Sequence, residues 1–244
     1  MLRTGIITTY LSLRLVVGRG FLDSYPGSLY PSGWVENPVR QLFLAPILCC
    51  VLTWTLSDDT YFPVKMKAGD EGVTAFEAQW YGKSLERMKE PRLPVLAMEA
   101  FSEVYRVLIL PTWGDSIVIR VQKHGQTYEL FARRLNGQAG YEVGQLVEAK
   151  DIDLSADDSR TLDMLLQNLA FFQLPTDDEV RGFDGDEWIL EGVSQGKYHV
   201  VQRWCAASYK SETRNLNAFL ALCKFLVDKS TLSERPSNKG HKLI

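Results

Sequence analysis

Apolar residues recur at helical spacing in three segments of the chain, which predicts three amphipathic helices. The first segment, residues 73–88, ends before Pro91. The second, residues 155–174, begins at Ser155, whose hydroxyl can cap a helix. The third covers residues 213–229. The apolar stripes consist of Val73, Phe76, Trp80, Leu85 and Met88 in the first segment, Leu162, Leu165, Leu166 and Leu169 in the second, and Leu216, Phe219, Leu220, Cys223 and Leu226 in the third.

The chain between these helices is rich in β-branched and aromatic residues, in short runs bounded by turn residues, which predicts strands. These runs are residues 104–113, 116–125, 127–137, 141–152 and the two halves of 186–204. The order of helix, strands, helix, hairpin and helix favours an α+β domain. We therefore expect, over residues 70–229, an antiparallel sheet of about five to six strands with helices packed on one face.

The hairpin DEWILEGVSQGKYHVVQRW, residues 186–204, offers two registers. A three-residue loop of Ser194, Gln195 and Gly196, with the glycine in a left-handed conformation, gathers Trp188, Tyr198 and Trp204 on one apolar face. A two-residue loop would mix apolar and polar residues on both faces. The three-residue loop is therefore the predicted one. It pairs Val193 with Lys197, Glu191 with His199, Ile189 with Val201 and Glu187 with Arg203.

This register predicts a polar face built from Glu187, Glu191, His199 and Arg203, which we take as the candidate binding surface. A carboxylate opposite an imidazole can orient it and raise its pKa, so His199 and Glu191 are the catalytic candidates if the protein is an enzyme. We find no Ser or Cys nucleophile in a strained turn beside them. A cross-strand polar pair that contributes about 0.2 to 1 kcal/mol to stability is the competing interpretation, and we predict no catalytic residue.

The segment RGFDGDEW, residues 181–188, precedes the first strand of the hairpin. Gly182 and Gly185 flank Asp184 and predict a tight turn. Its acidic residues could attract a cation, but their spacing does not match a calcium-binding loop. An Asx-type turn that begins the strand is the preferred interpretation.

Charge and cysteine content narrow the chemistry. The chain has 27 Lys and Arg against 30 Asp and Glu, which leaves it slightly acidic and argues against nucleic-acid binding. Cys49 and Cys50 are adjacent, while Cys205 and Cys223 each stand alone, so we predict no metal site. Without a Gly-rich phosphate loop we predict no cofactor. Cys205 and Cys223 could form a disulfide in an exported protein, or could both be small buried hydrophobes.

Residues 42–56 carry no charged side chain and follow Arg40. This length is short for a bilayer-spanning helix and suits the apolar core of a signal peptide. We therefore interpret residues 39–57 as a signal peptide or membrane-associated segment and predict a periplasmic or otherwise exported protein. The alternative is a buried element of a cytoplasmic protein.

The two ends of the chain are predicted to lie outside the folded domain. Signal peptides begin near the N-terminus, so residues 1–38 are interpreted as a poorly structured extension or as translated upstream sequence. A genuine amphipathic targeting segment is the alternative. Residues 230–244 combine Pro236 and Gly240 with polar side chains and are predicted to be a disordered tail.

The stretches EAQWYGKSLERMKEP, VYRVLILPTWGDSIVIRV and FDGDEWILEGVSQGKYHVVQRW resemble a family of bacterial proteins that look exported and have no established activity. The resemblance covers roughly residues 75–228 and is most specific in the hairpin. The family continues with Ser-Pro after its Arg-Trp, whereas Cys205 and Ala206 stand here, which leaves the role of the strand's end open. The matching positions are Tyr105, Arg106, Asp184, Gly185, Trp188, Glu191, Gly192, Gly196, Tyr198, His199, Arg203 and Trp204.

These observations support three hypotheses. The first is a non-catalytic module of the bacterial cell envelope that binds a protein or a small ligand. The second is a hydrolase-like enzyme, and the third is a cytoplasmic structural or interaction protein. A catalytic site should lie in a concave pocket, whereas a protein-binding face should be flat and open.

Overall fold

The structure is a computed structural model that describes residues 60–66, 72–99, 103–139, 141–210 and 213–233. The predictions for residues 1–38 and 39–57, and for Cys49 and Cys50, lie outside the described residues. Within them, no helix is both long enough and apolar enough to cross a membrane. The elements are α2 (Ala75–Arg87), α3 (Leu93–Leu96), β1 (Val104–Pro111), β2 (Ile117–His124), β3 (Thr127–Leu135), β4 (Leu146–Asp153), α4 (Ala156–Leu169), the 3₁₀ turn η2 (Phe171–Gln173), β5 (Asp186–Ser194), β6 (Lys197–Trp204) and α5 (Asn217–Lys229).

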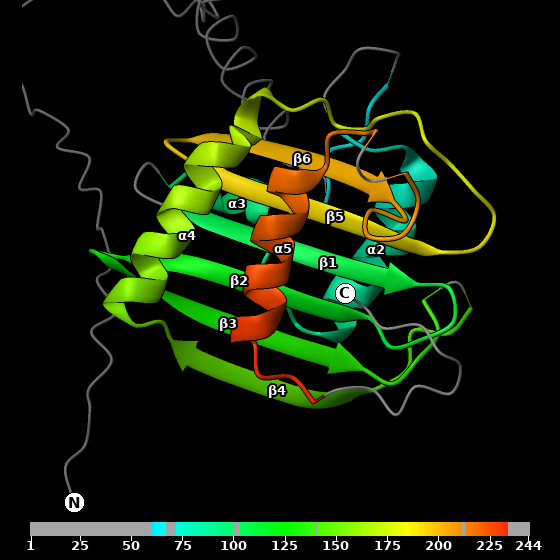
Figure 1. The fold of residues 1–244 in the computed structure, drawn as a ribbon. Coiled ribbons are helices and arrows are strands. Elements are labelled where there is room, and N and C mark those ends of the chain that lie inside the picture. The colour runs from blue at the N-terminus through cyan, green and yellow to red at the C-terminus, as the bar shows by residue number, and fades with distance from the viewer. Residues whose placement is uncertain (1–59, 67–71, 100–102, 140, 211–212, 234–244) are drawn as a thin grey trace, which may run out of the picture. The chain divides into compact units, whose positions relative to one another are not determined.

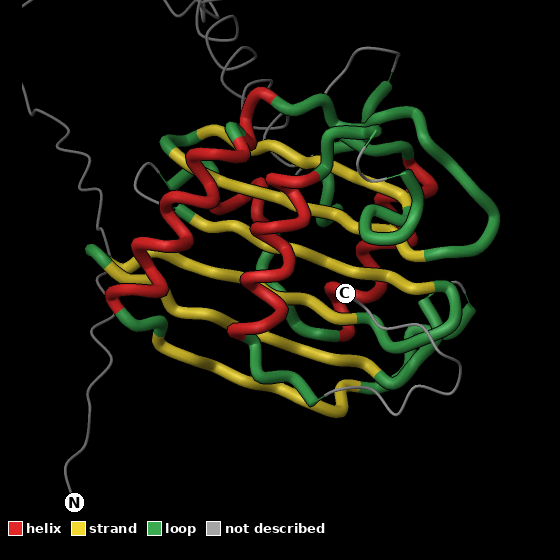
Figure 2. Tube along the Cα trace, in the orientation of Figure 1, coloured by secondary structure: helices red, strands yellow, loops and turns green. Residues whose placement is uncertain are grey.

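The strands form one six-stranded antiparallel sheet in the order β4-β3-β2-β1-β5-β6 (Figure 1). The first four strands form a meander, and the hairpin of β5 and β6 then adds beside β1 (Figure 2). The α+β class and the antiparallel sheet of five to six strands are confirmed.

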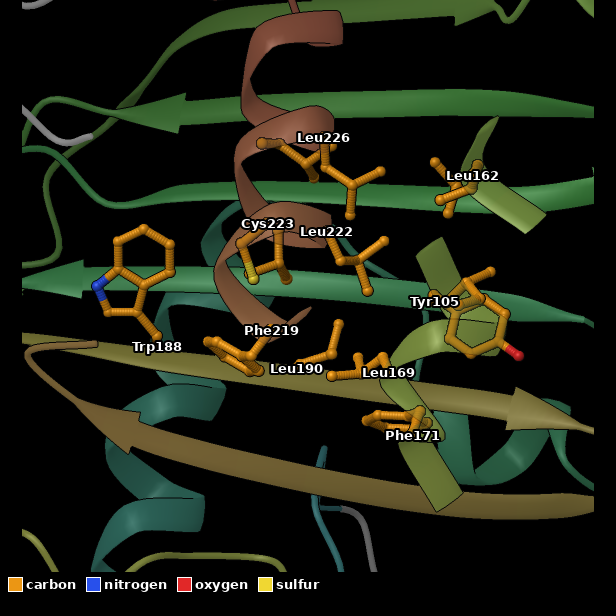
Figure 3. Packing of buried hydrophobic residues seen from close by; sticks show 14 of the residues in the cluster. Tyr105, Leu162, Leu169, Phe171, Trp188, Leu190, Phe219, Leu222, Cys223 and Leu226 are labelled. Carbon is orange, nitrogen blue, oxygen red and sulfur yellow. The ribbon is translucent and has the colours of Figure 1, made fainter. Parts of the chain in front are cut away.

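Both faces of the sheet carry helices. On one face, α4 and α5 cover an apolar core of which Figure 3 shows a part, including Trp188, Phe219 and Leu222. On the other face lies α2, with Tyr81 and Leu85 in a second cluster. The sequence placed helices on one face only, so α2 on the opposite face is an addition to that prediction. It follows from β1, which is buried along its whole length and needs cover on both sides.

The starts of α2 and α4 follow directly from their sequences. Thr74 and Glu77 form a capping box, in which the Thr74 hydroxyl accepts from the Glu77 amide and the Glu77 carboxylate accepts from the Thr74 amide. The Ser155 hydroxyl accepts from the Asp158 amide, as predicted. These side chains satisfy amide groups that have no partner within the helix.

Helix α5 ends at Lys229. The next residue, Ser230, caps it, is buried, and donates from its hydroxyl to the Val227 carbonyl. The amide of Ser233 donates to the Glu148 carboxylate of β4. The first residues of the predicted tail, 230–233, are thus held against the domain, and residues 234–244 lie outside the described residues.

The hairpin register differs from the prediction by one residue. Ser194 pairs with Lys197, so the loop consists of Gln195 and Gly196 alone. Both have positive φ, 52° and 75°, as a type I′ turn requires. The prediction of a three-residue loop is wrong because it assumed that only the glycine would adopt the left-handed conformation. Gln195 adopts it as well.

The shorter loop redistributes the side chains of both strands. Glu191 lies opposite Val200, and His199 lies opposite Gly192. Because opposed residues share a face, Glu191 and His199 point to opposite sides of the sheet. The predicted pairs of Glu191 with His199 and of Glu187 with Arg203 do not form. Trp188 faces α5, whereas Tyr198 packs on the α2 side, so the predicted aromatic face is also divided.

In this register, Gly192 packs directly against aromatic rings, which leaves no room for a side chain. A Cβ atom there would lie 2.5 Å from Phe171 Cε1 and 2.8 Å from Tyr105 Cδ1. We expect Gly192→Ala to lower the free energy of unfolding by about 1–3 kcal/mol, because the rings must move in a closed core. Gly82→Ala in α2 is the matched control, since its Cβ would meet only Tyr61, at 3.5 Å. It should be neutral or slightly stabilising. Urea unfolding measures both variants, and equal midpoints would contradict the register.

Candidate functional site

Glu187, Glu191, His199 and Arg203 do not share one surface. Glu187 and Glu191 lie on the α2 side of the sheet, and His199 and Arg203 lie on the side of α4 and α5. All four are buried. The expected polar face is therefore absent. Glu191, Glu187, and the pair of His199 and Arg203 each lie in a separate environment.

Glu191 belongs to a buried ion pair. Its Oε2 accepts from Arg106 Nε at 2.8 Å and from Arg106 Nη2 at 2.6 Å, and its Oε1 accepts from the Tyr198 hydroxyl at 2.9 Å. The side chains of Glu191 and Arg106 are completely inaccessible to solvent. Burial opposes the charge on Arg106, but Glu191 and Glu90 raise its pKa above the ordinary value. Glu191 thus has a partner for each oxygen.

The ion pair continues into the segment that follows α2. Arg106 Nη1 donates to the carbonyl of Pro91 at 2.7 Å, and Arg120 Nε donates to Glu90 Oε2 at 2.9 Å. Two acidic and two basic groups balance one another within this network. It fastens residues 90–91 to β1 and β2, and we assign it a structural role.

His199 and Arg203 hold the chain between α4 and β5. His199 Nε2 lies 2.9 Å from the Leu174 carbonyl, which can only accept, so this nitrogen carries the proton. Arg203 donates to the carbonyls of Pro175 and Thr176 at 3.0 and 3.2 Å. Both side chains bond to backbone carbonyls, while Arg203 Nε has no hydrogen-bond partner among the described residues and lies 3.8 Å from Asp178. Neither side chain faces Glu191 or Glu187.

The fourth residue, Glu187, lines a cavity of about 440 Å³. The cavity lies between α2, the end of β1, and the loop of residues 181–185 that precedes β5. Six aromatic rings and three acidic side chains contribute to it. The lining residues are Thr74, Phe76, Glu77, Trp80, Tyr81, Leu110, Thr112, Tyr141, Arg181, Gly182, Phe183, Asp184, Gly185, Glu187 and Trp204.

The loop of residues 181–185 forms one wall because its glycines let the backbone lie against a ring. A side chain at Gly182 would collide with the indole of Trp204. Gly185 is tied to the end of β1, since its carbonyl accepts from the Thr112 amide at 2.7 Å. Phe183 is left fully exposed. The sequence prediction of a tight turn here is consistent with this geometry.

The carboxyl group of Glu187 is the unusual feature of this cavity. The residue is 7% exposed, and its Oε1 has no hydrogen-bond partner among the described residues. Burial raises its pKa to about 8, with nearby acids including Glu77 adding to the effect and Arg181 opposing it. Glu187 is thus largely protonated at neutral pH.

The floor around Glu187 is held by hydrogen bonds from α2 to β6. The Tyr81 hydroxyl donates to Gln202 Oε1 and Gln202 Nε2 donates to Glu77 Oε1, both at 3.2 Å. Glu77 also closes the capping box of α2. These contacts fix the side of the helix that faces the cavity.

Sequence reasoning singled out Glu187 and the 181–188 segment but missed the contribution of α2. Phe76 was placed in the buried stripe of the first helix, whereas it is exposed beside the cavity. The buried ring of that helix is Tyr81, one position beyond Trp80. The three aromatic residues between Thr74 and Tyr81, with Glu77 among them, were the available signal.

Other candidate chemistry is limited to what the described part of the chain contains. Cys205 and Cys223 are both free and buried, and burial raises the pKa of the Cys223 thiol. Of the three acids in RGFDGDEW, Asp186 accepts from Trp188 Nε1, while Asp184 and Glu187 line the cavity. Across the described ranges, no three His, Cys, Asp or Glu side chains come together as a metal site.

The structural role of the Glu191 network can be tested by removing one partner. Arg106→Met would leave the Glu191 carboxylate buried beside a methionine, and we expect the free energy of unfolding to fall by about 3–5 kcal/mol. Arg106→Met with Glu191→Gln should recover part of this loss, since the charge is removed and the Tyr198 hydroxyl keeps an acceptor. Denaturant unfolding of Arg106→Met, Glu191→Gln and the double variant measures these changes. If the double variant is as unstable as the sum of the single changes, the pair is not the source of the effect.

The state of Glu187 gives a second prediction, on pH. Its pKa is about 8 in the folded protein against an ordinary value of 4.5, so the folded state binds the proton more tightly. The stability from this group is complete below about pH 4.5 and is lost as the pH rises towards 8. The wild type loses this contribution as the pH rises, whereas Glu187→Gln has no such group to ionise. The variant should therefore gain stability relative to the wild type by on the order of 1 kcal/mol per pH unit between pH 5 and 8. Glu86→Gln, which removes a carboxyl group from an exposed position of α2, is the matched control.

No family model matches the chain, and no curated protein matches its sequence. The resemblance to exported bacterial proteins, carried by the hairpin residues, therefore stays a prediction.

Proposed function

We propose that this protein binds a small ligand in the cavity between α2 and the loop of residues 181–185. The observation that carries the proposal is the buried carboxyl group of Glu187. This residue lines an aromatic cavity, and its Oε1 lacks a partner within the described structure. A buried polar atom without a partner costs stability, which a ligand can restore by supplying the missing hydrogen bond or charge.

The size and composition of the cavity support a small molecule as the ligand. Its volume of about 440 Å³ lies within the range of small-molecule sites. Such sites combine apolar walls with a few polar groups that fix the orientation of the ligand. Here the walls include Trp80 and Trp204, and Glu187 is the orienting group.

The proposed binding site lies elsewhere than the sequence predicted, but the class of function, a non-catalytic binding module, is the same. The binding module was expected on an open polar face of the sheet, and Glu187 is the one residue of that set that lines the cavity. The apolar residues 42–56 after Arg40 support a cell-envelope location for this activity, with the cytoplasm as the alternative.

Acid–base catalysis in the same cavity is a second candidate. A carboxyl group whose pKa is about 8 can hold or accept a proton near neutral pH. Glu187 would carry this chemistry, since His199 and Glu191 are held apart by the sheet. In that case Glu187→Gln should abolish turnover of a bound substrate.

The binding proposal is tested with a panel of aromatic fragments that are neutral, anionic or cationic, and of small saccharides, followed by ligand-observed NMR. At least one class should bind the wild type. Phe76→Ala with Phe183→Ala removes two exposed rings from the cavity, and should weaken that binding about tenfold through lost apolar contact. Met164→Ala, an exposed position on α4 across the sheet, is the control and should bind as the wild type does. Binding that persists equally in the double variant would contradict the proposal.

A further inference from the structure

The cavity has an acidic lining. Three carboxyl groups reach it, from Glu77, Asp184 and Glu187, against a single basic side chain, Arg181. Arg181 is already engaged, because its Nη2 donates to Asp177 at 2.8 Å. The same nitrogen lies 3.8 Å from Glu77 Oε1. Because the acidic groups of the lining outnumber this one cation, an anion entering the cavity would meet an excess of like charge, whereas a cation would be attracted.

The aromatic rings around these acids also favour a cation over an anion. The rings of Phe76 and Trp80 lie with centroids 6.1 Å apart, and those of Trp80 and Tyr81 lie 5.1 Å apart, all on one side of the cavity. Tyr141, a further lining ring, packs against Trp113 with centroids 5.1 Å apart. The negative faces of aromatic rings attract cations, and more strongly where water is excluded.

We infer that the ligand is an organic cation, with a protonated amine placed against Glu187 and an apolar body against the aromatic walls. This inference rests on the proposed binding function and names its ligand class. The amine supplies hydrogen-bond donors to the Glu187 carboxyl group, whose Oε1 has no partner among the described residues, and a charge that opposes the acidic lining. A neutral polyol would supply donors without the charge, and it is therefore one of the arms of the test.

Binding of the cation is coupled to the loss of one proton. Glu187 is largely protonated in the free protein at neutral pH, and it must ionise to pair with an ammonium group, releasing its proton to solvent. The affinity should therefore rise with pH until Glu187 is ionised in the free protein. The titratable groups around Glu187 are Glu77 and Tyr81 from α2, and Asp178, Arg181 and Asp184 from the segment before β5. Asp186, its neighbour in the strand, also raises its pKa.

The experiment is isothermal titration of the full chain at pH 6.5 and 8.5, with 2-phenylethylammonium, the neutral 2-phenylethanol and cellobiose as probes. An alkylamine stays protonated at both pH values. With a pKa of about 8 for Glu187, the ionised fraction, and with it the affinity for 2-phenylethylammonium, should increase roughly twentyfold between the two. Titration at pH 6.5 in two buffers of different ionisation enthalpy should report close to one proton released per complex.

Matched variants separate the charge of Glu187 from its shape. Glu187→Gln keeps the size of the side chain, and should lower the affinity for 2-phenylethylammonium at pH 8.5 by about tenfold or more and remove its pH dependence. The same variant should leave 2-phenylethanol binding within about twofold of the wild type. Glu86→Gln removes an equal charge from an exposed position of α2, and should leave the affinity for 2-phenylethylammonium unchanged.

The possible failures are distinguishable. If 2-phenylethanol or cellobiose binds the wild type as tightly as the cation at pH 8.5, the inference of a cationic ligand is overturned while the binding proposal stands. If cation binding is the same in Glu187→Gln as in the wild type, the role of Glu187 is overturned. If none of the three probes binds and no member of the wider fragment panel binds, both proposals fail.

Discussion

A turn of two residues with positive φ, Gln195 and Gly196, decides which side chains of β5 and β6 face α2 and which face α4 and α5. Side chains alternate along a strand, so one more residue in the loop would move every side chain of one strand to the other face relative to its partner. With this turn, Glu191 faces the α2 side with Tyr198, to which it is bonded. Both the buried ion pair and the cavity depend on that placement.

The elements of the fold were predictable because their signals are local. Helical spacing of leucines and the Ser155 cap predicted α4, and runs of β-branched residues predicted β1 and β2. The register was not predictable in this way, because the contacts that accompany it come from distant parts of the chain. Arg106 reaches Glu191 across 85 positions, and Tyr81 reaches Gln202 across 121. A pattern within the hairpin contains neither contact.

The site was predictable only in part, for the same reason. Its polar centre, Glu187, was identified on the strand, and the glycines of the 181–188 segment indicated a turn. The opposite wall comes from α2, which lies about a hundred positions earlier and on a face of the sheet where no helix was expected. The exposure of Phe76 could not be predicted from helical spacing. An apolar stripe has the same spacing in the sequence whether it packs against a core or lines a cavity.

Glu187 and Glu191 lie on the same face of one strand, and both are buried, yet their surroundings differ completely. Glu191 has Arg106 and Tyr198 as partners, so its burial is compensated within the protein. The basic group that opposes the raised pKa of Glu187 is Arg181, whose guanidinium is bonded to Asp177 instead. A fold that selected only for stability would gain by placing an apolar residue at position 187, because an unpartnered buried carboxyl is unfavourable. The contrast between two glutamates in one strand is therefore the physical reason to give Glu191 a structural role and to propose ligand binding for Glu187.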